Sequence, residues 1–447
     1  MSEKSSAASG GLAAASLDTG RGFESRRAVI TLILLTLAYT CVALDRAIIS
    51  VVLQPIKLEF ALSDSQLGML PLAFSLFFVA AGIPLGILAD RINRRSIIAG
   101  SLLAFSLATA LCGAAQSFVH LLLARIGVGA GEAGSGPAGM SMISDLFPDR
   151  QRARALSCYY LATPVGIILT FVVGGYLVGH FGWRMTFLAA GLPGVVLAIA
   201  VLILMREPVR EREEDSTVIT RNAPAVHLWA VVVRMSRAPA LRNLTLGITL
   251  NAMVSAAILI WCAPFLLRSH GMPVAHAGLV VGLFYGAVSV LGVLGGGFIA
   301  DRLSRLGQVW RTRLLSLAAL FSIPTLLGTL LFRDTFLMLA SFAAWAILSS
   351  LWYGPAYALT QSLVGVRQRA TVASVLYLLT NLIGAGLGPQ VVGLLSDVLA
   401  PQFGSQSLAY GMSIMAIGHL WAMFHFYRAG RTVERELGEQ QQFQGAH

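Results

Sequence analysis

Apolar stretches long enough to cross a membrane recur along the whole chain and are separated by short polar segments. A helix needs about 20 consecutive apolar residues to cross the hydrocarbon core of a bilayer. Twelve stretches meet this requirement, near residues 28–52, 66–89, 97–116, 119–144, 153–178, 183–205, 241–267, 276–300, 312–332, 335–362, 371–397 and 406–428. The pattern predicts an all-α integral membrane protein with twelve transmembrane helices.

Basic residues are distributed very unevenly between the loops that join these predicted spans. Of the 32 lysines and arginines, Arg46 and Arg125 lie within spans, and one set of loops holds only Lys57, Arg184, Arg268 and Arg333. All the others lie in the two tails and the alternate loops. Because lysine and arginine accumulate on the cytoplasmic side of a membrane protein, both termini are predicted to be cytoplasmic.

The sequence also contains an internal repeat. Gly-x-x-Ala-Asp-Arg at 86–91, after the second span, recurs at 297–302, after the eighth. Arg-Gln-Arg-Ala at 150–153 recurs at 367–370, before the fifth and eleventh spans. Two repeats at nearly equal offsets indicate a parallel duplication of six spans, an arrangement typical of transporters whose substrate site lies between the halves.

These boundaries suggest five segments. The predicted order is a disordered cytoplasmic tail, a first six-helix bundle, a cytoplasmic linker, a second six-helix bundle and a second cytoplasmic tail, over residues 1–27, 28–205, 206–240, 241–428 and 429–447.

Four ionisable residues are predicted to lie inside the membrane, all in the first half. Arg125 and Glu132 are seven residues apart in the fourth span, which places them on one face of a helix, two turns apart. Asp45 and Arg46, in the first span, should be level with Arg125, whereas Glu132 should lie deeper. Since adjacent helical residues point about 100° apart, we expect one of Asp45 and Arg46 to face the fourth span and the other the central cavity.

Buried charges in a membrane are costly and usually functional. We expect Glu132 and Asp45 to bind protons. Arg46 and Arg125 would be their charge partners or would bind a substrate phosphate, because an arginine can donate two parallel hydrogen bonds to a phosphate. Burial raises the pKa of a carboxyl group and a nearby arginine lowers it. A carboxylate that loses its arginine partner could therefore take up a proton. The alternative is a structural ion-pair network that only fixes helix packing.

Composition excludes several other classes of protein. Only 12% of residues are charged, against about 25% in soluble domains. The net charge of +11 is spread over short loops and is not clustered on one face, so we expect no nucleic-acid partner. Four separated cysteines and the absence of metal-binding spacing predict no metal or other cofactor. Gly129–Gly134 matches G-x-G-x-x-G, but no strand precedes it, and no enzyme motif is found.

The loop after the second span, GILADRINRR at 86–95, resembles the signature loop of the major facilitator superfamily. Leu44-Asp45-Arg46, Gly131-Glu132-Ala133 with Pro137, Asp145-Leu-Phe-Pro148, Phe181-Gly-Trp183-Arg184 and Gly386-Leu-Gly388-Pro389 resemble the Spinster-like branch of that superfamily. The resemblance covers about residues 28–428. It implies transport of amphipathic lipids such as lysophospholipids, with proton coupling. The fifth span lacks the Gly-Pro pair of the antiporter motif.

The same resemblance implies a set of gating residues in the repeated loops: Gly86, Asp90, Arg91, Arg94, Arg95, Asp301, Arg302 and Arg369. Asp90 is expected to meet the start of the eleventh span near Arg369 and to close the cytoplasmic side in the outward-facing state. Asp90 and Asp301 each end a helix, where a carboxylate opposes the helix dipole, so each should face a positive partner. For the arginines, membrane topology alone is an alternative explanation.

The second half carries polar and aromatic stripes in place of buried charges. Candidate substrate contacts there are Asn251, Tyr353, Tyr377 and Asn381. Helix packing by small polar residues, together with interfacial aromatic residues, explains the same pattern.

The sequence therefore predicts a monomeric secondary transporter of the bacterial inner membrane that works by alternating access. Its expected partners are the lipid bilayer, protons and a small amphipathic or anionic substrate such as a lysophospholipid. The alternatives are a drug exporter or organic-anion symporter of the same fold, because fold does not determine substrate, and a membrane sensor or scaffold that does not transport.

Overall fold

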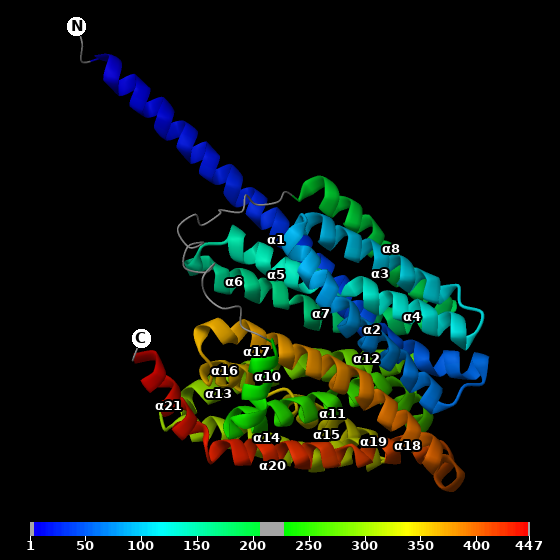
Figure 1. Cartoon of the computed structure of the whole chain (residues 1–447). Helices are drawn as coiled ribbons and strands as arrows, with labels where there is room; N and C mark the ends of the chain where they lie inside the picture. Colours follow the sequence, from blue (N-terminus) through cyan, green and yellow to red (C-terminus); the bar gives the residue numbers. More distant parts are fainter. Residues whose placement is uncertain (1–3, 206–227, 446–447) are drawn as a thin grey trace.

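A computed structural model describes residues 4–205 and 228–445 of the chain, and these residues form helices joined by short connections (Figure 1). The first part contains α1 Lys4–Phe60, α2 Asp64–Arg91, α3 Arg94–Gly113, α4 Phe118–Glu132, α5 Ser135–Leu146, α6 Asp149–Tyr160, α7 Ala162–Leu169, the π-helical η1 Thr170–Gly174 and α8 Gly175–Leu204.

The second part begins after the segment that lies outside the described residues. It contains α10 Leu228–Arg237, α11 Pro239–His270, α12 Val274–Val281, η2 Gly282–Ala287, α13 Val288–Ser304, α14 Gln308–Leu331, α15 Thr335–Leu348, α16 Tyr353–Ser362, α17 Val366–Leu379, η3 Thr380–Leu387, α18 Gly388–Phe403, η4 Gly404–Gln406, α19 Ser407–Ile414, α20 Ala416–Gly430 and α21 Val433–Gly445. The segments η2 and η3 are π-helical.

Within the described residues, nine helical segments are long and apolar enough to cross a membrane. Two of them, residues 154–204 and 371–430, are 51 and 60 residues long. Each is divided by a glycine with positive φ, Gly182 at 78° and Gly404 at 53°. Only glycine adopts such a φ without steric cost, so the chain can change direction there.

The predicted fourth span is broken in the middle. Helix α4 ends at Glu132 and α5 begins at Ser135. The sequence has a proline at position 137, and a proline disfavours a continuous helix because it lacks a backbone N–H donor.

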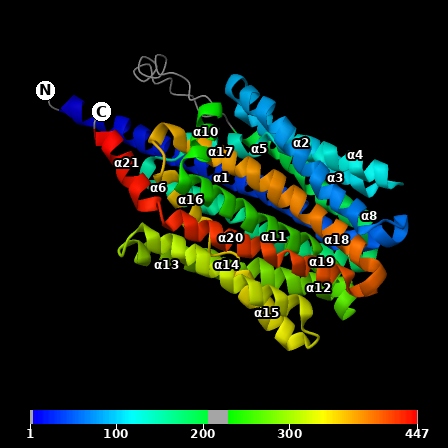
Figure 2. The ribbon, with the colours of Figure 1, turned by 60° about the horizontal axis from the view of Figure 1, so that its bottom comes forward.

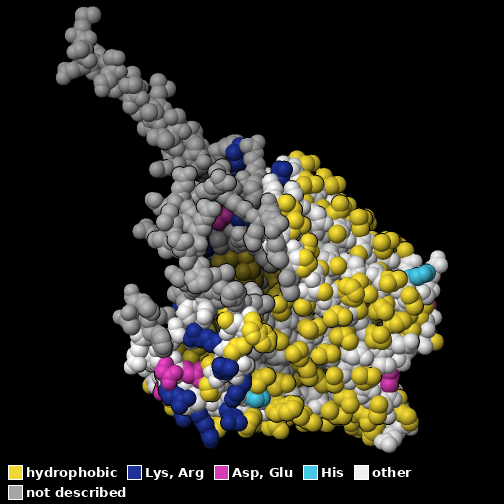
Figure 3. Space-filling view, viewed as in Figure 1, with side chains coloured by type: hydrophobic (Ala, Val, Ile, Leu, Met, Phe, Trp, Pro, Cys, Tyr) yellow, Lys and Arg dark blue, Asp and Glu magenta, His cyan; other side chains and the backbone are white. Residues whose placement is uncertain are grey.

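The helices gather into two bundles that diverge at one end. Helices α1 to α8 form one bundle and α10 to α20 the other (Figures 1 and 2). Both termini lie at the diverging end, which we call the terminal end; the opposite end is the distal end. The bundles meet where α2 packs along α18 and η3, and where α7 and η1 pack against α12 and η2. Figure 3 shows a hollow between the bundles on the terminal side.

The structure places helices in three segments outside the predicted spans. Residues 4–27, predicted to be disordered, continue α1, because a helix already nucleated by the first span is extended cheaply by Ala-rich sequence. The end of the predicted linker 206–240 forms α10, while residues 206–227 lie outside the described residues. The predicted second tail, 429–447, contains α21, which packs through the fully buried Val433.

Candidate functional site

Two ion pairs link α1 to α4 at the middle of the first bundle. Arg125 Nη1 donates to Asp45 Oδ2 at 3.0 Å, and Arg46 Nε donates to Glu132 Oε1 at 2.5 Å. Asp45 and Arg46 therefore do point in different directions, as expected from the helical rotation. The similar depth of Asp45 and Arg125 made them candidate partners, and the structure pairs them; it pairs the deeper Glu132 with Arg46.

The pair of Asp45 and Arg125 is enclosed within one bundle. The exposed fractions of the two side chains are 2% and 1%. The hydroxyl of Thr109, from α3, donates to the second carboxylate oxygen of Asp45. Cation–π contact adds to this, since the Arg125 guanidinium lies 5.1 Å from the centre of the Phe74 ring.

The pair of Arg46 and Glu132 instead reaches the second bundle. Arg46 Nη1 donates to Asn381 Oδ1 at 3.1 Å, and Nη2 donates to the Tyr377 hydroxyl at 3.4 Å. Its side chain is 29% exposed, against 1% for Glu132. The guanidinium thus joins a carboxylate of one half to an amide and a phenol of the other while remaining accessible.

Glu132 occupies an electrostatically demanding position. It is the last residue of α4, where the helix dipole is negative, so a carboxylate there requires a positive partner. Arg46 supplies that charge to Oε1, and Oε2 is buried without a hydrogen-bond partner among the described residues. Among the described residues, Arg46 is the ion-pair partner of this carboxylate.

Aromatic side chains surround Arg46. Its guanidinium lies 4.8 Å from the centre of the Phe78 ring, and the Phe78 ring contacts the Tyr377 ring across the two halves at 6.0 Å. Tyr353 of the second half is exposed, and its ring stacks on that of Trp352 at 4.2 Å. Aromatic rings from both halves, Phe78 and Tyr377, therefore lie beside the Arg46 guanidinium.

The structure separates one predicted substrate contact from this group. Asn251 is 2% exposed, its Oδ1 is hydrogen-bonded to Nδ1 of the buried His419 at 2.8 Å, and its Nδ2 donates to the Ser349 carbonyl. Asn251 belongs to a polar contact inside the second bundle, as the packing alternative predicts. Sequence reasoning missed Thr109, Phe74 and Phe78, because isolated Thr and Phe residues in an apolar span carry no distinguishing signal.

The predicted gating residues of the first half lie at the terminal end. Gly86 faces open space. Asp90 and Arg91 end α2, but their side chains lie outside the described part. Arg94 is buried and donates to Asp145 Oδ2 at 2.6 Å and to Ser141, whereas Arg95 donates to the Met205 carbonyl.

In the second half, Asp301 does have the positive partner expected for it. Arg311 Nη2 lies 3.2 Å from Asp301 Oδ1. Arg302 and Arg369 are exposed.

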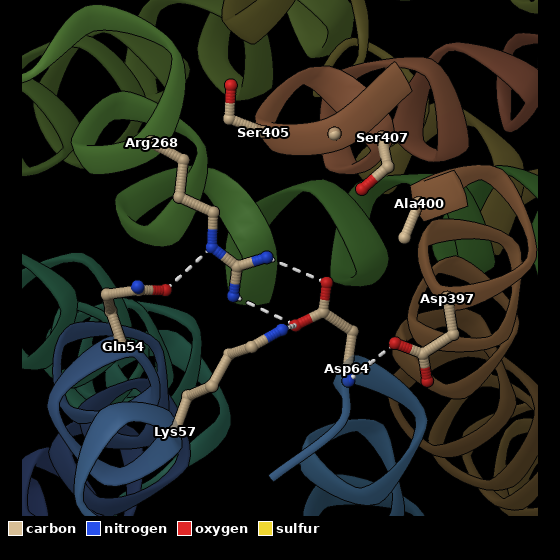
Figure 4. Close-up of a pocket in the computed structure, with 9 residues that line it drawn as sticks. Gln54, Lys57, Asp64, Arg268, Asp397, Ala400, Ser405 and Ser407 are labelled. Carbon is tan, nitrogen blue, oxygen red and sulfur yellow. Dashed lines mark hydrogen bonds and ion pairs between the residues drawn. The ribbon is translucent and has the colours of Figure 1, made fainter. Parts of the chain in front are cut away.

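A second polar cluster, which sequence reasoning missed, joins the two halves at the distal end (Figure 4). Asp64, at the start of α2, is buried. Its carboxylate oxygens accept hydrogen bonds from both terminal nitrogens of Arg268 on α11, at 2.7 and 2.9 Å. Lys57 Nζ donates to the same carboxylate at 2.5 Å. We call Lys57, Asp64, Arg268 and Asp397 the distal latch.

Asp397 of α18 completes the distal latch in an unusual way. Its two carboxylate oxygens accept hydrogen bonds from the backbone N–H groups of Asp64 and Ser65, at 2.9 and 2.8 Å. These are unpaired donors at the beginning of α2, so a residue of the second half caps a helix of the first. The only advance signal was the presence of Lys57 and Arg268 in loops that otherwise contain few basic residues.

Glycines bring the two halves together beside this cluster. A Cβ atom built on Gly278 of α12 would lie 2.1 Å from the Phe171 carbonyl oxygen of η1. One built on Gly175 would lie 3.2 Å from the Cα atom of Gly278. Hydrogen bonds and ion pairs between described residues of the two halves involve Arg46, Ser50 and the distal latch.

Residues 35–389 match the Major Facilitator Superfamily. The chain belongs to this superfamily. It is therefore an integral membrane protein, and its family and structural neighbours are transporters and not enzymes.

Individual relatives confirm the resemblance to the Spinster-like branch. The chain is 30% identical over 417 residues to an MFS-type efflux pump of Mycolicibacterium smegmatis, covering 93% of this chain and 95% of that protein. It is 29% identical over 413 residues to human protein spinster homolog 1, covering 85% and 76%.

A solved structure of a bacterial homolog to the human lysosomal transporter Spinster, inward-facing and unoccupied, superposes with a TM-score of 0.81. The two are 29% identical, and the superposition covers 92% of this chain and 98% of the other. A D-xylose-proton symporter, 16% identical with a TM-score of 0.69, shares the fold.

Proposed function

We propose that the protein is a proton-coupled secondary transporter with twelve spans in two bundles, 28–205 and 241–428, and with its tails and linker in the cytoplasm. The two long apolar segments each supply two spans, and α4 with α5 supplies the fourth. The uneven distribution of basic residues supports this orientation. The terminal end is then cytoplasmic, and we infer an inward-facing state and a location, as a monomer, in a bacterial inner membrane.

The observation that carries this proposal is the position of Arg46. It pairs with Glu132 in one half and donates to Asn381 and Tyr377 in the other, and it is accessible from the cavity. An anionic group of a substrate can compete with Glu132 for the guanidinium, which binds phosphate or carboxylate through parallel hydrogen bonds. Glu132 would then lose its charge partner.

Coupling follows from that competition. A carboxylate that is buried without a partner takes up a proton rather than remain ionised. We therefore assign the proton-coupling role first to Glu132 and second to Asp45, which keeps its own partners Arg125 and Thr109. Substrate and proton would be bound together in one state of the carrier and released together in the other.

The substrate class proposed is an amphipathic anion or zwitterion such as a lysophospholipid. Arg46 supports this choice by offering a site for a phosphate, and the surrounding phenyl and phenol rings offer apolar area for the rest of the molecule. The sequence resemblance to Spinster-like proteins implies transport of this kind.

Closure alternates between the two ends in this proposal. The distal latch closes the outer side in the inward-facing state. In the opposite state Asp90 would meet the start of α17 near Arg369, with Gly86, Arg91, Arg94, Arg95, Asp301 and Arg302 shaping the cytoplasmic loops. Alternating access of this kind needs both sets of contacts to be weak enough to break in each cycle.

The test uses purified protein in proteoliposomes with an imposed pH gradient and a radiolabelled lysophospholipid as probe. We expect Glu132→Gln to abolish gradient-driven accumulation while retaining exchange of labelled for unlabelled probe, and Asp45→Asn to do the same less completely. Glu59→Gln is the matched control, because Glu59 pairs with Arg184 at the distal surface of the same half. Accumulation at the wild-type level in both site variants would rule out the proton role.

Export of drugs is a second candidate function, and the observation favouring it is the efflux pump of Mycolicibacterium smegmatis among the relatives. A cationic drug would bind the aromatic rings and leave Arg46 paired. Accumulation or exchange of a labelled cationic drug in the same proteoliposomes, unaffected by Arg46→Gln, would favour this function over lipid transport.

A further inference from the structure

Two neighbouring helices of the second bundle present continuous apolar stripes to the outside. On α20 the exposed residues are Ile417, Leu420, Trp421, Phe424 and Tyr427, and on α14 they are Trp310, Leu317, Leu320 and Phe321. Their spacing of three and four places each set on one helical face. Figures 1 and 2 show α14 and α20 side by side. Both stripes therefore belong to one surface turned toward the bilayer.

Each stripe ends, on the terminal side, in an arginine stacked on an aromatic ring. The guanidinium carbon of Arg313 lies 4.7 Å from the centre of the Trp310 ring. The corresponding distances are 5.5 Å for Arg428 and Phe424, and 5.2 Å for Arg431 and Tyr427. The same pairing occurs three times, at a spacing of three or four residues. Stacking limits the freedom of each guanidinium and leaves its N–H groups at the edge of the ring available to a ligand.

The ends of the two stripes are adjacent. A Cβ atom on Gly430, between Arg428 and Arg431, would lie 2.5 Å from the hydroxyl of Thr312, which precedes Arg313. The terminal end of α11 adjoins them, because the His425 ring of α20 is hydrogen-bonded to Asn243, which follows Arg242 in the chain. The four arginines 242, 313, 428 and 431, which we call the arginine rim, thus surround the terminal ends of α11, α14 and α20. Figure 3 shows basic side chains gathered at this end of the second bundle.

Three carboxylates near this end of the second bundle are engaged with other groups. Asp301 pairs with Arg311, Glu439 with Arg435, and Glu436 accepts a hydrogen bond from the backbone N–H of Ala240. In the part of the chain that the structure describes, Arg242, Arg313, Arg428 and Arg431 have no carboxylate partner. Membrane topology alone requires positive charge on this side and apolar helix faces toward the lipid, but it does not require three guanidinium groups stacked on aromatic rings at the end of those faces.

We propose that the arginine rim binds the headgroup of an anionic phospholipid from the cytoplasmic leaflet, with the acyl chains lying along the stripes of α14 and α20. Arginine suits the phosphate diester because it donates two parallel hydrogen bonds. Basic pockets between transmembrane helices on the cytoplasmic side are typical sites for such headgroups. The inference rests on the proposed orientation of the chain, and it concerns a lipid that stays bound at the outer surface of the bundle and is not transported.

The experiment measures lipid binding to the purified full chain in detergent by native mass spectrometry. The probes are a phosphatidylglycerol and a phosphatidylcholine with the same acyl chains. We expect preferential retention of phosphatidylglycerol, and we expect the triple variant Arg313→Gln/Arg428→Gln/Arg431→Gln to weaken its binding by about 100-fold. Equal retention of the two lipids by the wild type would overturn the proposal.

Two further measurements distinguish a specific lipid-binding site from general electrostatic attraction of an anionic lipid. The triple variant Arg302→Gln/Arg305→Gln/Arg435→Gln removes the same charge from exposed arginines at the same end, and it should bind phosphatidylglycerol as the wild type does; an equal loss would mean that net charge alone attracts the lipid. Glycerol phosphate without acyl chains should not bind detectably, and tight binding of it would exclude the role of the stripes. Because no arm involves transport, the outcome is independent of whether Glu132 couples protons.

Discussion

At the scale of single residues, Asp45 and Glu132 differ in how their charge is balanced. Asp45 has two partners from two helices of its own bundle, Arg125 and Thr109. Among the described residues Glu132 pairs with Arg46 of its own bundle, and Arg46 in turn donates to Asn381 of the other bundle. Because the contacts of Arg46 with the opposite half must change when the halves move, the charge balance of Glu132 can change during the cycle, whereas Asp45 holds the first bundle together.

Thr109 provides a test of that structural role. Replacing Thr109 with Val leaves one oxygen of Asp45 buried without a donor, which costs about 1.5–3 kcal/mol for a charged acceptor. We expect the unfolding temperature of the detergent-solubilised protein to fall. Thr109→Ser retains the hydroxyl and is the matched control. If the two variants unfold at the same temperature, the hydroxyl does not contribute.

Much of this residue-scale arrangement could be predicted from the sequence. Helical rotation and depth alone assigned Asp45 to Arg125, because both rest on fixed helix geometry. Side chains that carry no charge could not be placed in this way, so Thr109 and Phe78 were missed and the choice between substrate contact and helix packing stayed open for Asn251. The helical face on which Asn251 lies is decided by how the second bundle packs, which no local pattern encodes.

At the scale of helices, the close contact between α12 and η1 depends on Gly278, which has no side chain. Gly278→Val would place a Cβ atom 2.1 Å from the Phe171 carbonyl oxygen, and the backbone cannot move aside as a flexible side chain can. We expect the two halves to separate at the distal end and the protein to shift toward an outward-facing state.

This shift can be measured through Ser50, which is 1% exposed and bonded to the Leu259 carbonyl of the other half. Ser50→Cys, in a background with the exposed Cys158 replaced by Ser, should react faster with a membrane-impermeant maleimide when Gly278→Val is added. Gly295→Val is the control, because a Cβ atom there meets open space. Equal labelling rates in the two glycine variants would contradict the prediction.

Helix positions were predictable, but interruptions and terminal segments were not. Apolar run length locates a span because the thickness of the bilayer fixes it. The break after Glu132 depends on a proline within an apolar run, where neighbouring helices often tolerate one. Helix α21 was missed because its burial rests on a few side chains, among them Val433, against a surface that only the folded bundle creates.

At the scale of the whole molecule, the distal latch favours the inward-facing arrangement. Removing the guanidinium in Arg268→Gln takes two donors from the buried Asp64 carboxylate. We expect the labelling of Ser50→Cys from the distal side to rise about tenfold, within the range of typical conformational coupling energies.

Arg184→Gln is the matched control for this prediction. Arg184 also lies at the distal surface, but its partner Glu59 belongs to the same half, so its loss should leave the labelling rate unchanged. A comparable increase in both variants would show that surface charge and not the latch controls opening.

Because Asp397 of one half caps α2 of the other, the exchange of two backbone amide protons depends on the stage of the transport cycle. While the distal end is closed, the amide protons of Asp64 and Ser65 are held by a carboxylate of the other half. Once the halves part, Ser63 still caps Gln66 from within its own half, but these two protons meet water. Their hydrogen–deuterium exchange should therefore track the fraction of time that the unlabelled, unmutated carrier spends open to the outside, and a transported substrate should change that rate.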